Sequence, residues 1–120
     1  MKRDPDLVRK LLLYFEAKAD DRVDKCPTIG RHSPLEIKYH LLLMDEAGFL
    51  RCERETTPTG RTIYVLPMSL TWQGHEFLEA ARNDKFWRRA KALVVKKSGA
   101  LSFDLLKAVL VSLATQAVAS

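Results

Sequence analysis

Residues 33–50, SPLEIKYHLLLMDEAGFL, have the pattern of a complete helix with both ends marked. Ser33 is a favourable N-cap residue, and Pro34 suits the first helical position because its missing N–H costs nothing there. Glu36 lies at the third position and can close a capping box with Ser33. Gly48 can adopt the left-handed conformation that commonly ends a helix. The stretch therefore predicts a helix that runs up to this glycine.

The predicted helix has apolar side chains on two opposite sides. At about 100° per residue, one side is expected to face the core. That side carries Ile37, His40, Leu41, Met44 and Ala47. The other side carries Leu35, Tyr39 and Leu42, so these three residues are predicted to bind a partner. Three interpretations remain open for them: packing under the C-terminal helices or in a homodimer, docking of a different protein, or contact with DNA.

Periodicity predicts the elements on either side. Asp4 caps a first helix that begins at Pro5, and polar residues 20–33 form a loop. Thr28 and Ile29 could form a very short edge strand within that loop. After the central helix, residues 49–53 and 61–66 favour two strands of a hairpin. The loop between them contains both Pro and Gly.

Three more helices follow the hairpin. Thr71 caps the first, residues 84–97 form the second, and Ser102 caps the last. Trp72 and Trp87 are interpreted as core residues of these helices. The order of elements predicts a mainly α protein with a small β-hairpin (α+β), specifically a winged helix-turn-helix with a two-helix C-terminal extension. The predicted domains are residues 1–82 and 83–120.

Two segments carry a resemblance to known proteins. HSPLEIKYHLLLMDEAGFL followed by a hairpin, and then SLTWQGHEFLEAAR, resembles winged helix-turn-helix proteins. The whole chain looks more narrowly like a family of small bacterial and prophage proteins that is catalogued only as a domain of unknown function. MKRDPDLVRKLL, LTWQGHEFL, the Phe-Trp pair after Asp84 and SFDLLK carry that likeness. The resemblance implies a winged-helix fold and a bacterial or phage origin, but no activity and no catalytic residue. A full helix-turn-helix also has a positioning helix, for which residues 20–33 are too short and too polar.

Positive charge is concentrated far from the central helix. The net charge is +5, and residues 85–97 hold six basic residues and no acidic one, so the rest of the chain sums to −1. The central helix has Lys38 against three acidic residues, among which Asp45 and Glu46 are expected to be exposed. Basic groups bind phosphates, and each contact adds affinity through counterion release. Three interpretations remain open for the basic helix at residues 85–97: a solvated face, contact with nucleic acid, or contact with an anionic membrane or an acidic partner. The residues predicted to bind nucleic acid are Arg31, Lys38, Arg54, Arg61, Lys85, Arg88, Arg89 and Lys96.

No pattern in the sequence favours catalysis or a cofactor. No arrangement suggests a nucleophile with its base, and the glycines are turn and cap residues rather than a phosphate loop. Cys26, His32, His40 and Cys52 lack the spacing of a zinc site. His40 is interpreted as a partly buried, hydrogen-bonded histidine. We therefore predict no enzyme, no cofactor and no metal.

The predicted function is a small DNA-binding or transcription-regulating protein of bacterial or prophage type that binds double-stranded DNA. The alternative is a protein-interaction or dimerisation module that has lost DNA reading, with a homodimer formed through the C-terminal helices. The two cysteines and the polar N-terminus favour a cytoplasmic protein. The most apolar stretch, residues 100–119, includes charged residues and is not expected to insert into a membrane.

Overall fold

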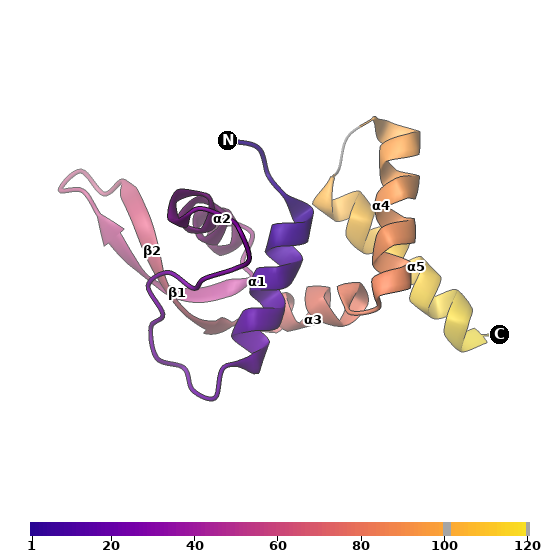
Figure 1. The fold of residues 1–120 in the computed structure, drawn as a ribbon, viewed down its shortest axis with the longest axis horizontal. Coiled ribbons are helices and arrows are strands. Elements are labelled where there is room, and N and C mark those ends of the chain that lie inside the picture. The colour runs from indigo at the N-terminus through magenta and orange to yellow at the C-terminus, as the bar shows by residue number, and fades with distance from the viewer. Residues whose placement is uncertain (100–101, 120) are drawn as a thin grey trace. The chain divides into compact units, whose positions relative to one another are not determined.

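The computed structural model describes residues 1–99 and 102–119, which form five α-helices and one two-stranded antiparallel sheet (Figure 1). In chain order the elements are α1 (Pro5–Ala17), α2 (Pro34–Glu46), β1 (Leu50–Thr56), β2 (Thr62–Leu70), α3 (Trp72–Ala81), α4 (Asp84–Ser98) and α5 (Phe103–Ala119). This confirms the predicted α+β class. The chain divides into two compact units, Met1–His75 and Glu76–Ser120, earlier than the predicted boundary after residue 82. The apolar stretch at residues 100–119 begins with two residues outside the described part.

The helix caps form as the sequence predicts. Asp4 accepts hydrogen bonds from the backbone N–H groups of Asp6 and Leu7 at 3.0 and 3.3 Å, which fixes the start of α1. At α2, Ser33 Oγ accepts from the Glu36 N–H at 3.2 Å, while the Glu36 carboxylate accepts from the Ser33 N–H at 3.3 Å. Gly48, with φ of +79°, provides the left-handed residue after this helix. The central stretch therefore folds from its own local signals.

The core of the first unit gathers apolar residues from α1, α2 and the hairpin. Leu7, Leu11 and Leu12 of α1 are fully buried, and Ile37, Leu41 and Met44 of α2 are almost fully buried. They belong to the sides of the two helices that the 3.6-residue period assigns to the core. Both helices contact β2, and α2 also contacts β1, so the hairpin completes this core (Figure 1).

No helix forms between α1 and α2 in the described residues, as the polar composition of residues 20–33 predicts. The connecting loop instead follows the outer edge of β2. The Asp24 N–H donates to the Pro67 carbonyl at 3.0 Å, and Lys18 Nζ donates to the Met68 carbonyl at 2.9 Å. The suggested strand at Thr28 and Ile29 is wrong, because these residues join no sheet. The loop therefore covers a strand edge that would otherwise expose unpaired backbone groups.

The hairpin is longer than predicted, and β2 continues through Pro67. Proline cannot donate a ladder hydrogen bond, and it is tolerated at irregular or edge positions of a sheet. Pro67 pairs with Cys52 next to a shift of register between Arg51 and Cys52. The bulge and the outer-edge position together explain how the strand passes the proline.

Trp72 is not a core residue, so its predicted place in the core was wrong. Its side chain is 79% exposed at the first position of α3. Gly74 explains this, because a Cβ added there would lie 2.2 Å from the Phe49 carbonyl oxygen. The Gly74 side of α3 must therefore approach the backbone closely. Two residues correspond to about 200° of helix, so Trp72 projects from the opposite side.

In the second unit, α4 and α5 pack against each other around aromatic and aliphatic residues. Trp87 is buried, as predicted, and its ring meets the Phe77 ring edge-on at 6.5 Å between centroids. Ala90 and Val94 of α4 are buried, as are three leucines of α5, namely Leu106, Leu110 and Leu113. Burying this side of α4 leaves the opposite side to solvent.

Candidate nucleic-acid interface

The eight basic residues predicted to bind nucleic acid are all exposed, but they divide between the two units. Four lie in the first unit: Arg31 before α2, Lys38 on α2, Arg54 on β1 and Arg61 at the end of the hairpin loop. The other four, Lys85, Arg88, Arg89 and Lys96, lie on α4 of the second unit. We therefore describe each group separately.

Arg54 is held by an acidic residue of α2. Its Nε and one terminal nitrogen donate to the two carboxylate oxygens of Asp45 at 2.9 and 2.8 Å. The Asp45 side chain is only 7% exposed, so its expected exposure was wrong, whereas the Arg54 side chain is 54% exposed. Two parallel charge-assisted bonds fix both partners in one plane. Arg54 therefore joins the hairpin to the end of α2, and its positive charge is largely neutralised.

Cys52 lies beside this ion pair. Burial and the Asp45 carboxylate raise the pKa of the Cys52 thiol from 9.0 to about 12. The thiolate is the reactive form of cysteine, and almost none is present at neutral pH. The Cys52 thiol is therefore unreactive at neutral pH, and we assign Cys52 and the Asp45–Arg54 pair a structural role.

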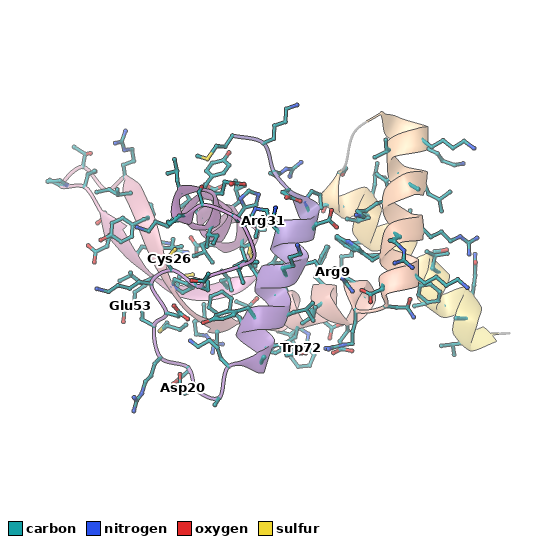
Figure 2. The ribbon with its side chains drawn as sticks, in the orientation of Figure 1. Arg9, Asp20, Cys26, Arg31, Glu53 and Trp72 are labelled. Carbon is teal, nitrogen blue, oxygen red and sulfur yellow. The ribbon has the colours of Figure 1, made fainter. Side chains whose placement is uncertain are left out.

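The other three predicted nucleic-acid-binding residues of the first unit are not in ion pairs. Within the described residues, the side chains of Arg31, Lys38 and Arg61 form no ion pair. Arg31 lies in the loop that leads into α2 (Figure 2). Arg61 follows the loop glycine, and only its backbone is engaged, with Thr57. These three groups are available to an anionic ligand.

The second apolar side of α2 is partly open to solvent. Leu35 is 65% exposed, whereas Tyr39 and Leu42 are half-buried. Glu46 and Lys38 lie on the same side of the helix at the 3.6-residue period. This surface contains one basic group, Lys38, among apolar and acidic ones, so it offers few of the polar donors that usually read base edges.

His40 is buried on the other side of α2, as the sequence predicts, with 1% of its surface exposed. Its Nδ1 lies 2.8 Å from the Glu36 carbonyl oxygen, and its Nε2 accepts from the Asp4 N–H at 2.8 Å. Both ring nitrogens are therefore used within the fold, and neither is open to a metal ion. Among residues 1–99 and 102–119, no three His, Cys, Asp or Glu side chains gather in a way that could hold a metal.

The basic residues of α4 share one side of the helix, which we call the α4 basic stripe: Lys85, Arg88, Arg89 and Lys96. At 100° per residue they fall within about 100° of the helix circumference, and Lys97 lies well outside that arc. None of the four forms an ion pair with a described residue. Lys91 belongs to another side, where its Nζ lies 5.7 Å from the centre of the Trp87 ring. The stripe is thus an exposed row of unpaired cations.

Comparison with known proteins places the chain in a family. A family described as a hypothetical protein, DUF2513, matches residues 2–100. The chain belongs to the DUF2513 family. It is also 34% identical over 121 residues to an uncharacterised protein of Haemophilus influenzae strain Rd, and the match covers 99% of this chain and all of the relative. No solved structure matches it.

The DUF2513 match agrees with the likeness to a domain of unknown function that the sequence motifs indicate. It covers the hairpin, α2 and all of α4, so both groups of basic residues lie within the family region. No helix in the described part is both long and apolar enough to cross a membrane.

Sequence reasoning did not find the Asp45–Arg54 pair. Nine positions separate the two residues, and a turn and part of a strand intervene, so no helical or strand period relates them. The only signal was an acidic residue at the end of a helix and an arginine on the following strand. Such a pattern is common, and it becomes informative only when the register of the hairpin is known.

Proposed function

We propose that this DUF2513 protein is a small, non-enzymatic DNA-binding module of the winged-helix type that regulates transcription in a bacterium or prophage. The observation that carries the proposal is the state of its predicted cations. Seven of the eight are exposed and unpaired within the described residues, and the exception is Arg54. Long unpaired cations are the groups that bind phosphate oxygens.

The order of elements supports the winged-helix part of the proposal. A helix is followed by α2, an antiparallel hairpin in the place of a wing, and a further helix. In winged-helix proteins the helix before the wing enters the major groove. The connection of residues 18–33 contains no positioning helix, so the proposal describes a reduced form of that fold.

Salt dependence of duplex binding tests this proposal. Fluorescence anisotropy with a labelled duplex should show binding at micromolar protein in 50 mM salt and much weaker binding in 200 mM salt, because phosphate contacts release counterions. Absence of any salt-sensitive duplex binding at micromolar protein would refute the proposal.

The alternative is a protein-interaction or dimerisation module, and the exposed side of α2 favours it. Leu35, Tyr39 and Leu42 present apolar surface, and the acidic residues of α2 outnumber its one lysine. A homodimer would show a mass that rises with concentration in sedimentation velocity, and Leu35→Asp should return that mass to the monomer if α2 forms the interface. A dimer that persists in this variant would point to the C-terminal helices instead. A monomer at every concentration argues against dimerisation.

A further inference from the structure

The two groups of basic residues differ in what surrounds them, and this difference indicates which group holds DNA. We infer that the DNA contact is made by the α4 basic stripe, on the phosphate backbone of a duplex and without sequence preference, rather than by α2 in the major groove. This inference rests on the proposed function and specifies its site and its ligand.

The surroundings of α2 disfavour a polyanion. Asp45 neutralises Arg54, the one cation of β1 that is fixed beside α2. Glu36 and Glu46 add negative charge to the helix, against Lys38. The exposed side of α2 is mainly apolar, and apolar groups contact thymine methyls but do not distinguish guanine. Phosphate would approach α2 against an unfavourable local field.

The cations of α4 are not explained by the stability of the helix. The positive end of a helix dipole is at its N-terminus, where basic side chains are unfavourable. Lys85 nevertheless lies in the first turn, and Arg88 and Arg89 follow in the second. Lys96 lies in the last turn, where the dipole does favour a cation. Asp84, the first residue of α4, places one carboxylate in that turn, so the N-terminal half of the helix carries three cations against one acidic group at the positive end of the dipole. This excess of positive charge attracts an anion.

The second unit has the charge needed for this role. Residues 76–120 contain eight Lys and Arg and four Asp and Glu. From Lys85 to Lys96 the stripe rises about 16 Å along the helix axis at 1.5 Å per residue. One DNA strand carries a phosphate about every 3.4 Å along the duplex axis. The stripe is thus long enough for its four cations to contact several phosphates of one strand.

The side chains around the stripe favour duplex DNA over other anionic polymers and surfaces. Proteins that hold single strands stack bases on exposed aromatic rings, whereas Trp87 is buried. The other exposed α4 residues near the stripe are Asp84, Ala92 and Val95. Helices that lie in a membrane interface insert several large apolar side chains, whereas Val95 is the one large apolar residue exposed on the described part of α4. The long cationic side chains of the stripe suit the phosphate backbone of a duplex, where charge provides the contact.

Salt titrations of matched variants test the inference. The protein is titrated onto two labelled duplexes of unrelated sequence and onto one single strand, between 50 and 200 mM salt. Four phosphate contacts predict a slope of about −3.6 in log K against log salt, which is about a 150-fold loss of affinity over that range. Lys85→Ala with Lys96→Ala should halve the slope, so that the loss falls to about 12-fold. Alanine favours helix, so α4 should remain folded, as circular dichroism can verify.

Lys97→Ala with Lys107→Ala is the control, because it removes two exposed lysines of the same unit that lie off the stripe. Its slope should match that of the wild type, and both duplexes should bind with equal affinity. A slope lowered by Arg31→Ala with Lys38→Ala but not by the stripe variant would overturn the inference and leave the proposed function standing. Strong preference for one duplex, or tighter binding of the single strand, would also overturn it. Failure of the wild type to bind any duplex would refute the proposed function itself.

Discussion

The backbone N–H of Asp4 donates a hydrogen bond to Nε2 of His40 over 2.8 Å and across 36 positions of the chain. Asp4 caps α1 with its side chain, while His40 lies in the middle of α2. The Glu36 carbonyl can only accept and the Asp4 N–H can only donate, so the ring is neutral and carries its proton on Nδ1. One buried side chain thereby joins the start of the first helix to the second.

Replacing His40 should destabilise the first unit. His40→Ala leaves a cavity at a site that is 1% exposed and removes the acceptor of the Asp4 N–H. We expect a loss of about 2–4 kcal/mol in the free energy of unfolding, measured by denaturant titration. His40→Phe fills the site with a somewhat larger ring and removes both nitrogens, so this variant should still lose part of the stability that His40→Ala loses. His75→Ala, at an exposed site, should change stability by less than about 0.5 kcal/mol. Equal effects of the His40 and His75 changes to alanine would contradict the structural role.

The sequence predicts the helices well, because their starts and stops are local. Asp4 and Ser33 each bond to N–H groups two or three positions ahead, and Gly48 supplies the left-handed residue. The position of His40 on the core side also follows from the 3.6-residue period. The hydrogen bond between His40 and Asp4 does not follow from that period, because it depends on how α1 and α2 pack.

The loss of folding stability as the pH falls should depend in part on Glu36. The hydrogen bond from His32, followed by that from the Ser33 N–H, lowers the pKa of the Glu36 carboxyl below its ordinary value of 4.5. The folded state therefore binds fewer protons than the unfolded state as pH falls through this range. The stabilisation is fully present above the unfolded pKa and is lost as pH falls through the lower folded pKa.

Glu36→Gln should flatten this dependence, because glutamine keeps the capping acceptor but cannot titrate. Thermal melting temperatures at a series of pH values from 6 to 3 provide the measurement. Glu46→Gln, at an exposed site on the same helix, is the matched control. If both variants change this loss of stability equally, the cap is not the source of the pH dependence.

The errors of prediction arise where tertiary contacts decide the outcome. Composition favours burial of a tryptophan in an amphipathic helix, but the close approach of Gly74 to the Phe49 carbonyl sets the orientation of α3 and turns Trp72 outward. The polar neighbours of Asp45 predict that it is exposed, but Arg54 contacts it from the following strand. Neither the contact of Gly74 with the Phe49 carbonyl nor that of Asp45 with Arg54 can be obtained from spacing along the chain.

The two tryptophans should report their different environments. The Trp72 side chain is 79% exposed, whereas Trp87 is 2% exposed (Figure 2 labels Trp72). Trp87→Phe leaves Trp72 as the only tryptophan, and Trp72→Phe leaves Trp87. Acrylamide should quench the fluorescence of the first variant with a several-fold larger Stern–Volmer constant than the second. Equal Stern–Volmer constants for the two native variants would contradict the assigned burial.

Cys52 should react slowly with alkylating reagents. Burial and the Asp45 carboxylate raise the pKa of its thiol to about 12, so its thiolate fraction at pH 8 is about a thousandfold below that of a thiol at the ordinary value of 9.0. Cys26→Ser leaves Cys52 as the only cysteine, and mass spectrometry can follow its modification by iodoacetamide. The native rate should rise about tenfold per pH unit from pH 8 to pH 10, because each unit raises the thiolate fraction tenfold. The same variant in denaturant is the control, and equal native and unfolded rates would show that the thiol is neither buried nor held beside Asp45.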